Sequence, residues 1–231
     1  MAADRFVPGS PSHWTLVALM VLGAVVVAVI GRRQRDPVRF ARAFAAVVLA
    51  FNVPLLVYRQ LPAQWDVGES LPLHLCDVAW VVAAVALWTE RPLACALVHY
   101  WGLTLTPQAI ITPALDAPDF PHVDFLEFWG QHLLVIWSAA YLTWGVGVRP
   151  TWRGYWFSVG VTVAWGLAVL AFNSRAGTNY GVVSRKPDNP SLLDVMGGWP
   201  WYLGVAVAVG TAGWALLTWP WTRAPRRVVR A

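Results

Sequence analysis

The sequence is short of charged residues. Asp, Glu, Lys and Arg make up only 13% of its 231 residues, whereas 58% are hydrophobic and the mean hydropathy is +0.52. A soluble globular domain has about 25% charged and about 45–50% apolar residues. This deficit excludes an ordinary soluble domain and indicates an integral membrane protein. At this length we expect one all-α transmembrane domain, residues 1–231, with no second domain.

Cysteine and the common cofactor motifs are scarce as well. Cys76 and Cys95 are the two cysteines, which are too few for a disulfide scaffold. The sequence contains no Gly-rich phosphate loop, no dinucleotide fingerprint and no elbow-serine motif. It also lacks the closely spaced histidine pair that many zinc sites use. We therefore expect no cofactor and no bound metal.

The net charge of +5 raises the question of a nucleic-acid partner. The arginines, however, lie between apolar runs and do not form one soluble basic face. We expect membrane lipids as partners and no nucleic acid.

The chain contains seven apolar runs, each near the roughly 17–25 residues that cross a bilayer core as a helix. They are residues 14–30, 40–58, 73–88, 93–111, 124–148, 155–172 and 199–219. The first run is longer than the hydrophobic region of a signal peptide, about 7–15 residues, and no cleavage pattern follows it. The sequence therefore predicts a polytopic bundle of seven transmembrane helices.

Basic residues in the connections predict the orientation. One set of connections carries twelve arginines, and the other carries five basic residues. The positive-inside rule places the richer set in the cytoplasm. The N-terminus is then outside, and the C-terminus, with a basic tail at residues 222–231, is cytoplasmic. Opposite sides for the two termini require an odd number of spans, which seven satisfies.

In this orientation, polar side chains gather at the outer ends of five predicted spans, where one outer-facing pocket can collect them. They are His74, Cys76, Asp77, Gln108, His122, Glu127, Gln131, His132, Asn173, Asn179 and Tyr180.

Cys76 is the best candidate nucleophile in this set, because a thiol becomes reactive when a nearby base or helix N-terminus favours its thiolate. Ser70 and Pro72 predict a helix start that leaves Cys76 just beyond the first turn. His74, two residues away, points to another side of a regular helix, and the charge of Asp77 opposes the thiolate. The alternative is that Cys76 is a small buried hydrophobic residue.

A base from another helix is therefore favoured, and His132 and His122 are the candidates. His132 lies roughly 12 Å along the predicted helix from its start, at about 1.5 Å per residue, so it must pair or face a cavity. Glu127 and Gln131 lie close to it on the helix surface, and a hydrogen-bonded packing cluster is the alternative. His122 is equally consistent with a plain loop histidine.

The segment from residue 173 to 198 is unusually long for a connection, which is typical of lids and binding segments. Arg175, Arg185 and Lys186 in it can meet lipid phosphates. The alternative is a solvated loop held by interfacial tryptophans.

A combination of short motifs in roughly residues 40–205 resembles the bacterial YwaF-like multi-pass membrane proteins, and through them the eukaryotic transmembrane protein 164 acyltransferases. The motifs are His74-Leu75-Cys76-Asp77, Tyr100-Trp101-Gly102-Leu103, Gln108, Thr112-Pro113, Phe120-Pro121-His122, Gln131-His132, Gly177-Thr178-Asn179-Tyr180 and Trp199-Pro200-Trp201-Tyr202. The resemblance implies a bacterial cell-membrane protein with a catalytic cysteine at Cys76 and the family's Gln-His pair at Gln131 and His132. The chain differs in having Asp77 directly after the cysteine and its histidine before it, at His74.

Three hypotheses follow. The first is a cysteine-dependent phospholipid acyltransferase in which Cys76 attacks a lipid ester, His132 is the base, and Gln131 or Asn179 donates to the oxyanion. Its catalytic group is Cys76, His132 and His74, and its substrate-binding group is His122, Gln108, Gln131, Asn179, Tyr180 and Arg175. The second is a non-catalytic lipid-binding or transport-associated protein. The third is a metal-dependent lipid hydrolase that uses the outer histidines with Asp77 and Glu127.

Overall fold

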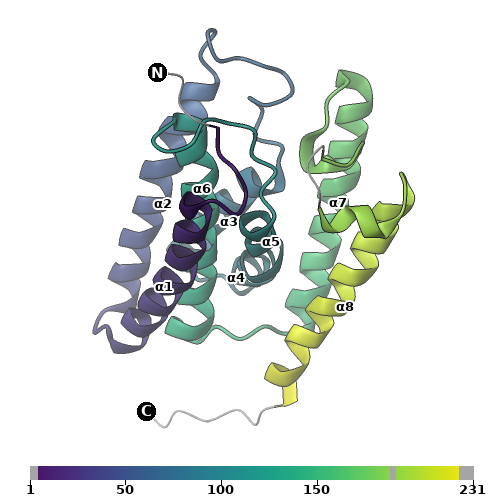
Figure 1. The fold of residues 1–231 in the computed structure, drawn as a ribbon. Coiled ribbons are helices and arrows are strands. Elements are labelled where there is room, and N and C mark those ends of the chain that lie inside the picture. The colour runs from purple at the N-terminus through teal and green to yellow at the C-terminus, as the bar shows by residue number, and fades with distance from the viewer. Residues whose placement is uncertain (1–4, 188–190, 224–231) are drawn as a thin grey trace.

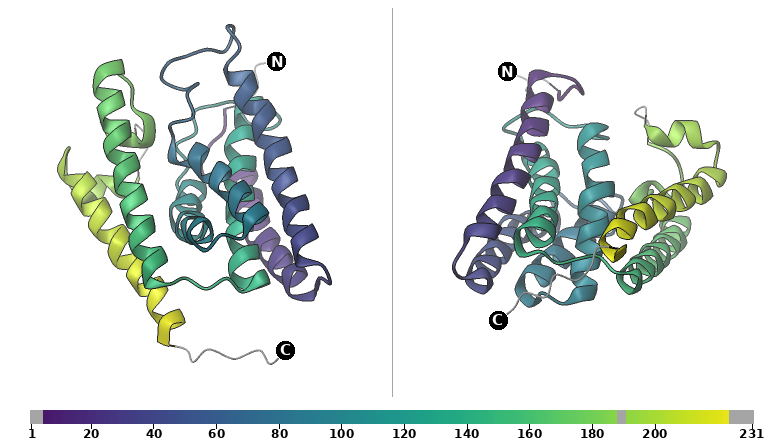
Figure 2. Two further views of the ribbon diagram at one scale, coloured as in Figure 1. Left: turned by 180° about the vertical axis from the view of Figure 1, so that it is seen from behind. Right: turned by 90° about the horizontal axis from the view of Figure 1, so that it is seen from below.

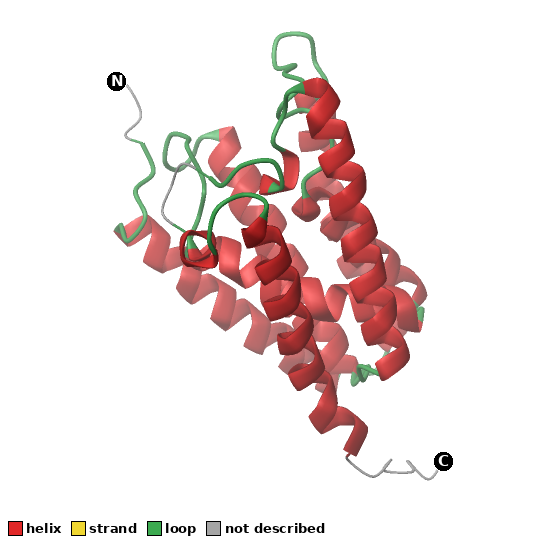
Figure 3. Ribbon diagram, turned by 90° about the vertical axis from the view of Figure 1, so that its right-hand side faces the viewer, coloured by secondary structure: helices red, strands yellow, loops and turns green. Residues whose placement is uncertain are grey.

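The protein is all-helical over the residues that its computed structural model describes, 5–187 and 191–223. The α-helices are α1 (Pro11–Arg33), α2 (Pro37–Arg59), α3 (Leu75–Thr89), α4 (Pro92–Tyr100), α5 (Thr106–Ile111), α6 (Val123–Ala140), α7 (Trp152–Ala176) and α8 (Trp201–Arg223). Two π-helical segments, η1 (Trp101–Leu105) and η2 (Tyr141–Val146), and two 3-10 segments, η3 (Tyr180–Val182) and η4 (Leu192–Met196), complete the order. Most of the predicted basic tail at 222–231 lies outside the described residues. The all-α prediction is confirmed (Figure 3).

Local chemistry sets the helix ends, most of which lie one to four residues outside the predicted apolar runs. Ser10, Asp36 and Thr151 each accept a backbone N–H in the first turn of α1, α2 and α7. α7 ends at Gly177, whose φ of 70° suits a residue without a Cβ atom. The long predicted loop after residue 173 is therefore shorter than expected, and η3 and η4 lie within it.

Four helices, α1, α2, α7 and α8, are long and apolar enough to cross a membrane. Large apolar side chains remain exposed along their outer faces, for example Val21, Leu22, Val25, Leu167 and Leu216. A continuous apolar surface of this kind suits lipid and not water. Together these helices make the chain a multi-pass membrane protein.

The remaining predicted spans are shorter or composite helices. The apolar helix α3 has 15 residues. The series α4–η1–α5 runs without a break over residues 92–111, and α6–η2 runs over residues 123–146. Each of the seven predicted runs thus coincides with a helix or a continuous series. That all seven cross the bilayer, with the N-terminus outside, stays a prediction.

The helices form three groups. Figure 1 shows α1, α2 and α6 on one side, α3, α4 and α5 in the middle, and the pair α7 and α8 on the other side, and Figure 2 shows the same pair from two further directions. Small residues let the helices of the first two groups approach closely, as in many membrane bundles. Ala41 and Ala45 of α2 and Ala83 of α3 are completely buried. A Cβ atom on Gly102 would lie 2.7 Å from that of Ala139 in α6.

The start of α3 differs from the prediction. The expected first turn with Ser70 and Pro72 is wrong, because the helix begins at Leu75 with His74 as its N-cap residue. The Asp77 carboxylate accepts the His74 backbone N–H at 3.0 Å and so fixes the start there. Ser70 instead closes a turn in the preceding loop, where its hydroxyl accepts the Asp66 N–H at 2.9 Å. Cys76 is therefore the second residue of the helix and lies inside its first turn.

Candidate functional site

A cavity of about 500 Å³ separates the α7–α8 pair from the rest of the bundle. This volume is within the roughly 300–1,000 Å³ of small-molecule sites. Its polar lining comes from His74, Cys76, Gln108, His132 and the hydroxyl residues Thr106, Thr112, Thr162, Ser191 and Thr211. Apolar residues of α7 and α8 form much of the opposite wall, including Val159, Val163, Leu167, Leu170, Ala206, Val207 and Trp214. The cavity therefore combines polar side chains from α3, α5 and α6 with a long and mostly apolar wall from α7 and α8.

Cys76 presents its thiol to this cavity from the first turn of α3. It is a free cysteine and is partly accessible, whereas Cys95 in α4 is 2% exposed. The positive end of the helix dipole at this position favours an anion such as a thiolate. The alternative of a fully buried packing cysteine describes Cys95 better than Cys76.

His132 lies in α6, which packs against α3, and reaches the same cavity. Its Nδ1 atom is 2.5 Å from the backbone oxygen of Phe128. A carbonyl oxygen can only accept, so Nδ1 must carry the hydrogen and the neutral ring keeps its lone pair on Nε2. His132 is thus held as the tautomer that a general base at Nε2 requires.

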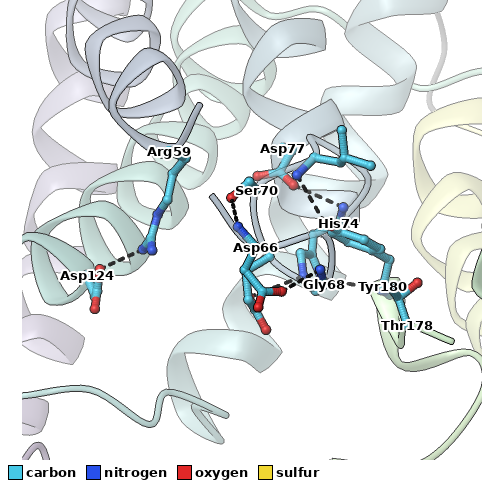
Figure 4. Close-up of polar contacts among 12 residues, drawn as sticks. Arg59, Asp66, Gly68, Ser70, His74, Asp77, Asp124, Thr178 and Tyr180 are labelled. Atoms are coloured by element: carbon cyan, nitrogen blue, oxygen red, sulfur yellow. Dashed lines mark hydrogen bonds and ion pairs between the residues drawn. The ribbon is translucent and has the colours of Figure 1, made fainter. Parts of the chain in front are cut away.

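His74 has a different role from His132. Its Nδ1 atom accepts the backbone N–H of Gly181 at 3.3 Å, and its ring centroid is 4.9 Å from that of Tyr180. Burial lowers the pKa of His74, which lies just before the helix, so the ring is neutral at pH 7. His74 therefore joins the segment around η3 to the start of α3 (Figure 4).

Gln131 contacts Asp77, the residue after Cys76, and does not line the cavity. It is 6% exposed, and its Nε2 atom donates to the Asp77 carboxylate at 3.4 Å. Asp77 thus receives both the His74 N–H and the Gln131 amide. This pairing connects the first turn of α3 to α6.

Tyr180 and Asn179 stabilise the outer loops. The fully buried Tyr180 donates its hydroxyl hydrogen to the Val67 carbonyl at 2.8 Å and accepts the Leu71 N–H at 3.0 Å. Asn179 accepts the N–H groups of Ser184 and Arg185 and donates to the Arg185 carbonyl. Neither residue lines the cavity, although the neighbouring Gly181 does.

Arg175 and His122 lie outside the cavity lining as well. Arg175 is exposed at the end of α7 and donates to the Ala171 carbonyl of its own helix. His122 is the N-cap residue of α6 and accepts the Asp124 N–H at 3.3 Å. Of the predicted site residues, the fold therefore brings Cys76, His132, His74 and Gln108 to one cavity.

The carboxylates proposed as metal ligands have other partners. Arg59, at the end of α2, pairs with Asp124 at 2.7 Å and with Glu127 at 2.6 Å in α6 (Figure 4 shows the Asp124 pair). Within residues 5–187 and 191–223, no three His, Cys, Asp or Glu residues lie close enough together to hold a metal ion. The proposed convergence of His122 with the other histidines does not occur in this fold.

Sequence reasoning missed the wall that α7 and α8 supply. Trp165 lines the cavity and donates its indole N–H to the Leu73 carbonyl at 3.1 Å, and Trp214 donates to Thr104 at 2.9 Å. Both tryptophans lie well inside apolar runs and away from the interfacial belts where Trp is expected. An indole N–H within the hydrocarbon needs an acceptor. A tryptophan in the middle of an apolar run is therefore the sequence feature that could have indicated these two positions.

Three comparisons with known proteins bear on the family to which this chain belongs. A search of curated proteins and a search of solved structures give no match. The model of the TMEM164 family matches residues 9–218, which is most of the chain and includes every cavity residue named above. The YwaF-like part of the predicted resemblance stays a prediction. This multi-pass membrane protein belongs to the TMEM164 family.

Proposed function

We propose that this protein transfers a fatty acyl chain between phospholipids through a thioester on Cys76. The observation that carries the proposal is the placement of a free, partly exposed cysteine and of a histidine with Nε2 unprotonated on one cavity with a long apolar wall. The thiol supplies the nucleophile, His132 supplies the base, and the apolar wall suits an acyl chain. Family membership agrees with this proposal.

The first half-reaction acylates the enzyme. The Cys76 sulfur attacks the ester carbonyl of the donor phospholipid while its proton moves to Nε2 of His132. The bond between the carbonyl carbon and the glycerol oxygen then breaks, and the departing oxygen takes the proton from His132. The products are a lysophospholipid and a thioester on Cys76.

The second half-reaction reverses these roles. The free hydroxyl of an acceptor lysophospholipid gives its proton to His132 and attacks the thioester carbonyl. The carbon–sulfur bond breaks, and the thiolate regains its proton from His132. Donor and acceptor lipids supply every atom, so no further co-reactant is needed.

The proposal includes an orientation. Seven crossings of a bacterial cell membrane, with the N-terminus outside and the C-terminus in the cytoplasm, place the first turn of α3 near the outer leaflet. Lipids of that leaflet are then the substrates. His74 and Gln108 line the same cavity as Cys76 and would contact the polar part of the lipid.

An acyl-exchange assay in proteoliposomes tests the activity, with a labelled acyl chain on the donor and an unlabelled lysophospholipid as acceptor. We expect Cys76→Ala to abolish exchange and Cys95→Ala, which removes the other sulfur, to keep it. Equal exchange by the Cys76→Ala and wild-type proteins would overturn the proposal.

The large apolar cavity also favours a second candidate, a lipid-binding protein without chemistry. In that case wild-type protein would retain a stoichiometric phospholipid through purification and show no exchange. The Cys76→Ala variant would retain the same lipid.

A further inference from the structure

Two backbone N–H groups at the start of α3 donate to no other residue in the part of the chain that the structure describes. The first N–H groups of any helix lack acceptors within the helix. In α3, the N–H groups of Asp77 and Val78 bond to the His74 carbonyl, and the N–H of His74 bonds to Asp77. The remaining N–H groups are those of Leu75 and Cys76, and both residues line the cavity.

A second, independent feature points to a ligand at this place. His132 is only 5% exposed, and its Nδ1 hydrogen is already donated to Phe128. Its Nε2 atom has no partner within the described residues, yet the side chain lines the same cavity as Cys76. This nitrogen is therefore free to accept a hydrogen from a ligand or substrate in the cavity.

The side chains first considered as oxyanion donors have other partners. The Gln131 amide donates to Asp77, and the Asn179 amide donates to the Arg185 carbonyl. Neither residue lines the cavity. Attack on an ester nevertheless places a negative charge on the carbonyl oxygen, and donors for that charge usually make a large contribution to catalysis.

We propose that the backbone N–H groups of Leu75 and Cys76 form the oxyanion site of this enzyme. The inference rests on the proposed acyl transfer. As the bond from sulfur to carbon forms, the carbonyl electron pair moves onto oxygen, beside the backbone of the residue that attacks. The two N–H groups and the positive end of the α3 dipole stabilise that charge. The pair then returns to re-form the carbonyl as the glycerol oxygen leaves.

A proline substitution tests one of these donors directly. Proline lacks an N–H and is well tolerated at the first position of a helix, which Leu75 occupies. The preceding residue, His74, has φ −64° and ψ 149°, the extended conformation that residues before proline prefer. Leu75→Pro therefore deletes the donor with little change in fold. Leu75→Ala is the matched control, because it shortens the side chain and keeps the N–H.

Two reactions of Cys76 separate the oxyanion effect from general reactivity. Acylation by p-nitrophenyl palmitate passes through an oxyanion, whereas alkylation by iodoacetamide does not. Both rates are measured by intact-protein mass spectrometry in a Cys95→Ala background. We expect Leu75→Pro to lower the ratio of acylation to alkylation by about 10²–10³-fold. Leu75→Ala, which keeps the N–H group, should keep the wild-type ratio.

An unchanged ratio in Leu75→Pro would overturn the proposal, as would an equal loss in Leu75→Ala. A second measurement uses protein with Leu75 unchanged, so its result does not depend on whether the proline variant folds. The infrared carbonyl stretch of a ¹³C-labelled acyl group on Cys76 should lie below that of the same thioester in an apolar solvent. A band at the apolar-solvent position would contradict the two donors.

The outcomes also separate this inference from the proposed function. If p-nitrophenyl palmitate acylates Cys76 with the expected donor dependence but no phospholipid exchange occurs, the lipid-transfer function fails and the oxyanion site stands. If phospholipid exchange requires Cys76 but Leu75→Pro leaves the ratio of acylation to alkylation unchanged, the proposed oxyanion site is wrong and the proposed function stands.

Discussion

At the scale of single residues, the two cysteines differ in burial and in their position in the helices. Cys95 lies in the core of the bundle at 2% exposure, whereas Cys76 lies in the first turn of α3 against a cavity. Sequence alone could select Cys76, because histidine and aspartate flank it. It could not show that Asp77 caps the helix at His74 and accepts from Gln131, since that contact joins residues 54 positions apart.

Replacement of His132 by Gln tests the base. Because the imidazole takes the thiol proton, we expect the His132→Gln variant to acylate Cys76 about 10²–10⁴-fold more slowly. The remaining rate should rise steadily with pH, since hydroxide in solution must then ionise the thiol. His99→Gln is the matched control, because His99 is also buried in the bundle but bonds to Thr143 near the other cysteine. A His132→Gln variant with the wild-type rate and pH profile would remove His132 from the mechanism.

At the scale of elements, the lengths of the apolar runs predicted all seven long helices or continuous helical series, but the interruptions within them were not predictable. The series α4–η1–α5 contains a π-helical segment, and such segments are frequent at functional sites. The segment shifts the register of the helix just before Leu105, Thr106 and Gln108 reach the cavity lining. The π-helical segment packs against α6 through Gly102 and bonds to α7 through Trp101 and Thr162. Because these contacts come from distant parts of the chain, the local sequence does not predict the segment.

The crossing directions of these elements also need a direct test. The arginine-rich connections predict that the α8 end is cytoplasmic and that the connection between α5 and α6 is outside. We expect alkaline phosphatase fused after residue 231 to be inactive and a green fluorescent protein there to fluoresce. A phosphatase inserted in the connection at residues 113–118 should be active. An active phosphatase at the C-terminus would overturn the proposed orientation and the assignment of the outer leaflet.

At the scale of the whole molecule, the fold separates a tightly packed group of helices from the α7–α8 pair and leaves the cavity between them. Polar contacts join the pair to the group near both ends. Tyr100 bonds to Thr218 of α8 at 2.6 Å. At the other end, Tyr202 of α8 donates to the Val182 carbonyl of η3 at 2.6 Å, and the neighbouring Gly181 donates its N–H to His74 at 3.3 Å. The stretch between these contacts supplies the apolar wall. The polar residues of the cavity could be predicted, because they interrupt apolar runs in the sequence. The apolar wall could not be predicted, because it depends on how α7 and α8 pack against the other helices.

The most direct test of the account is the mass of the protein itself. Wild-type protein is incubated with vesicles of one diacyl phosphatidylcholine, without added lysophospholipid, and its intact mass and peptides are measured. We predict the addition of a single acyl group, located on Cys76 and removed by neutral hydroxylamine as a thioester is. Protein that gains no acyl group, or gains it on Cys95, would contradict the account.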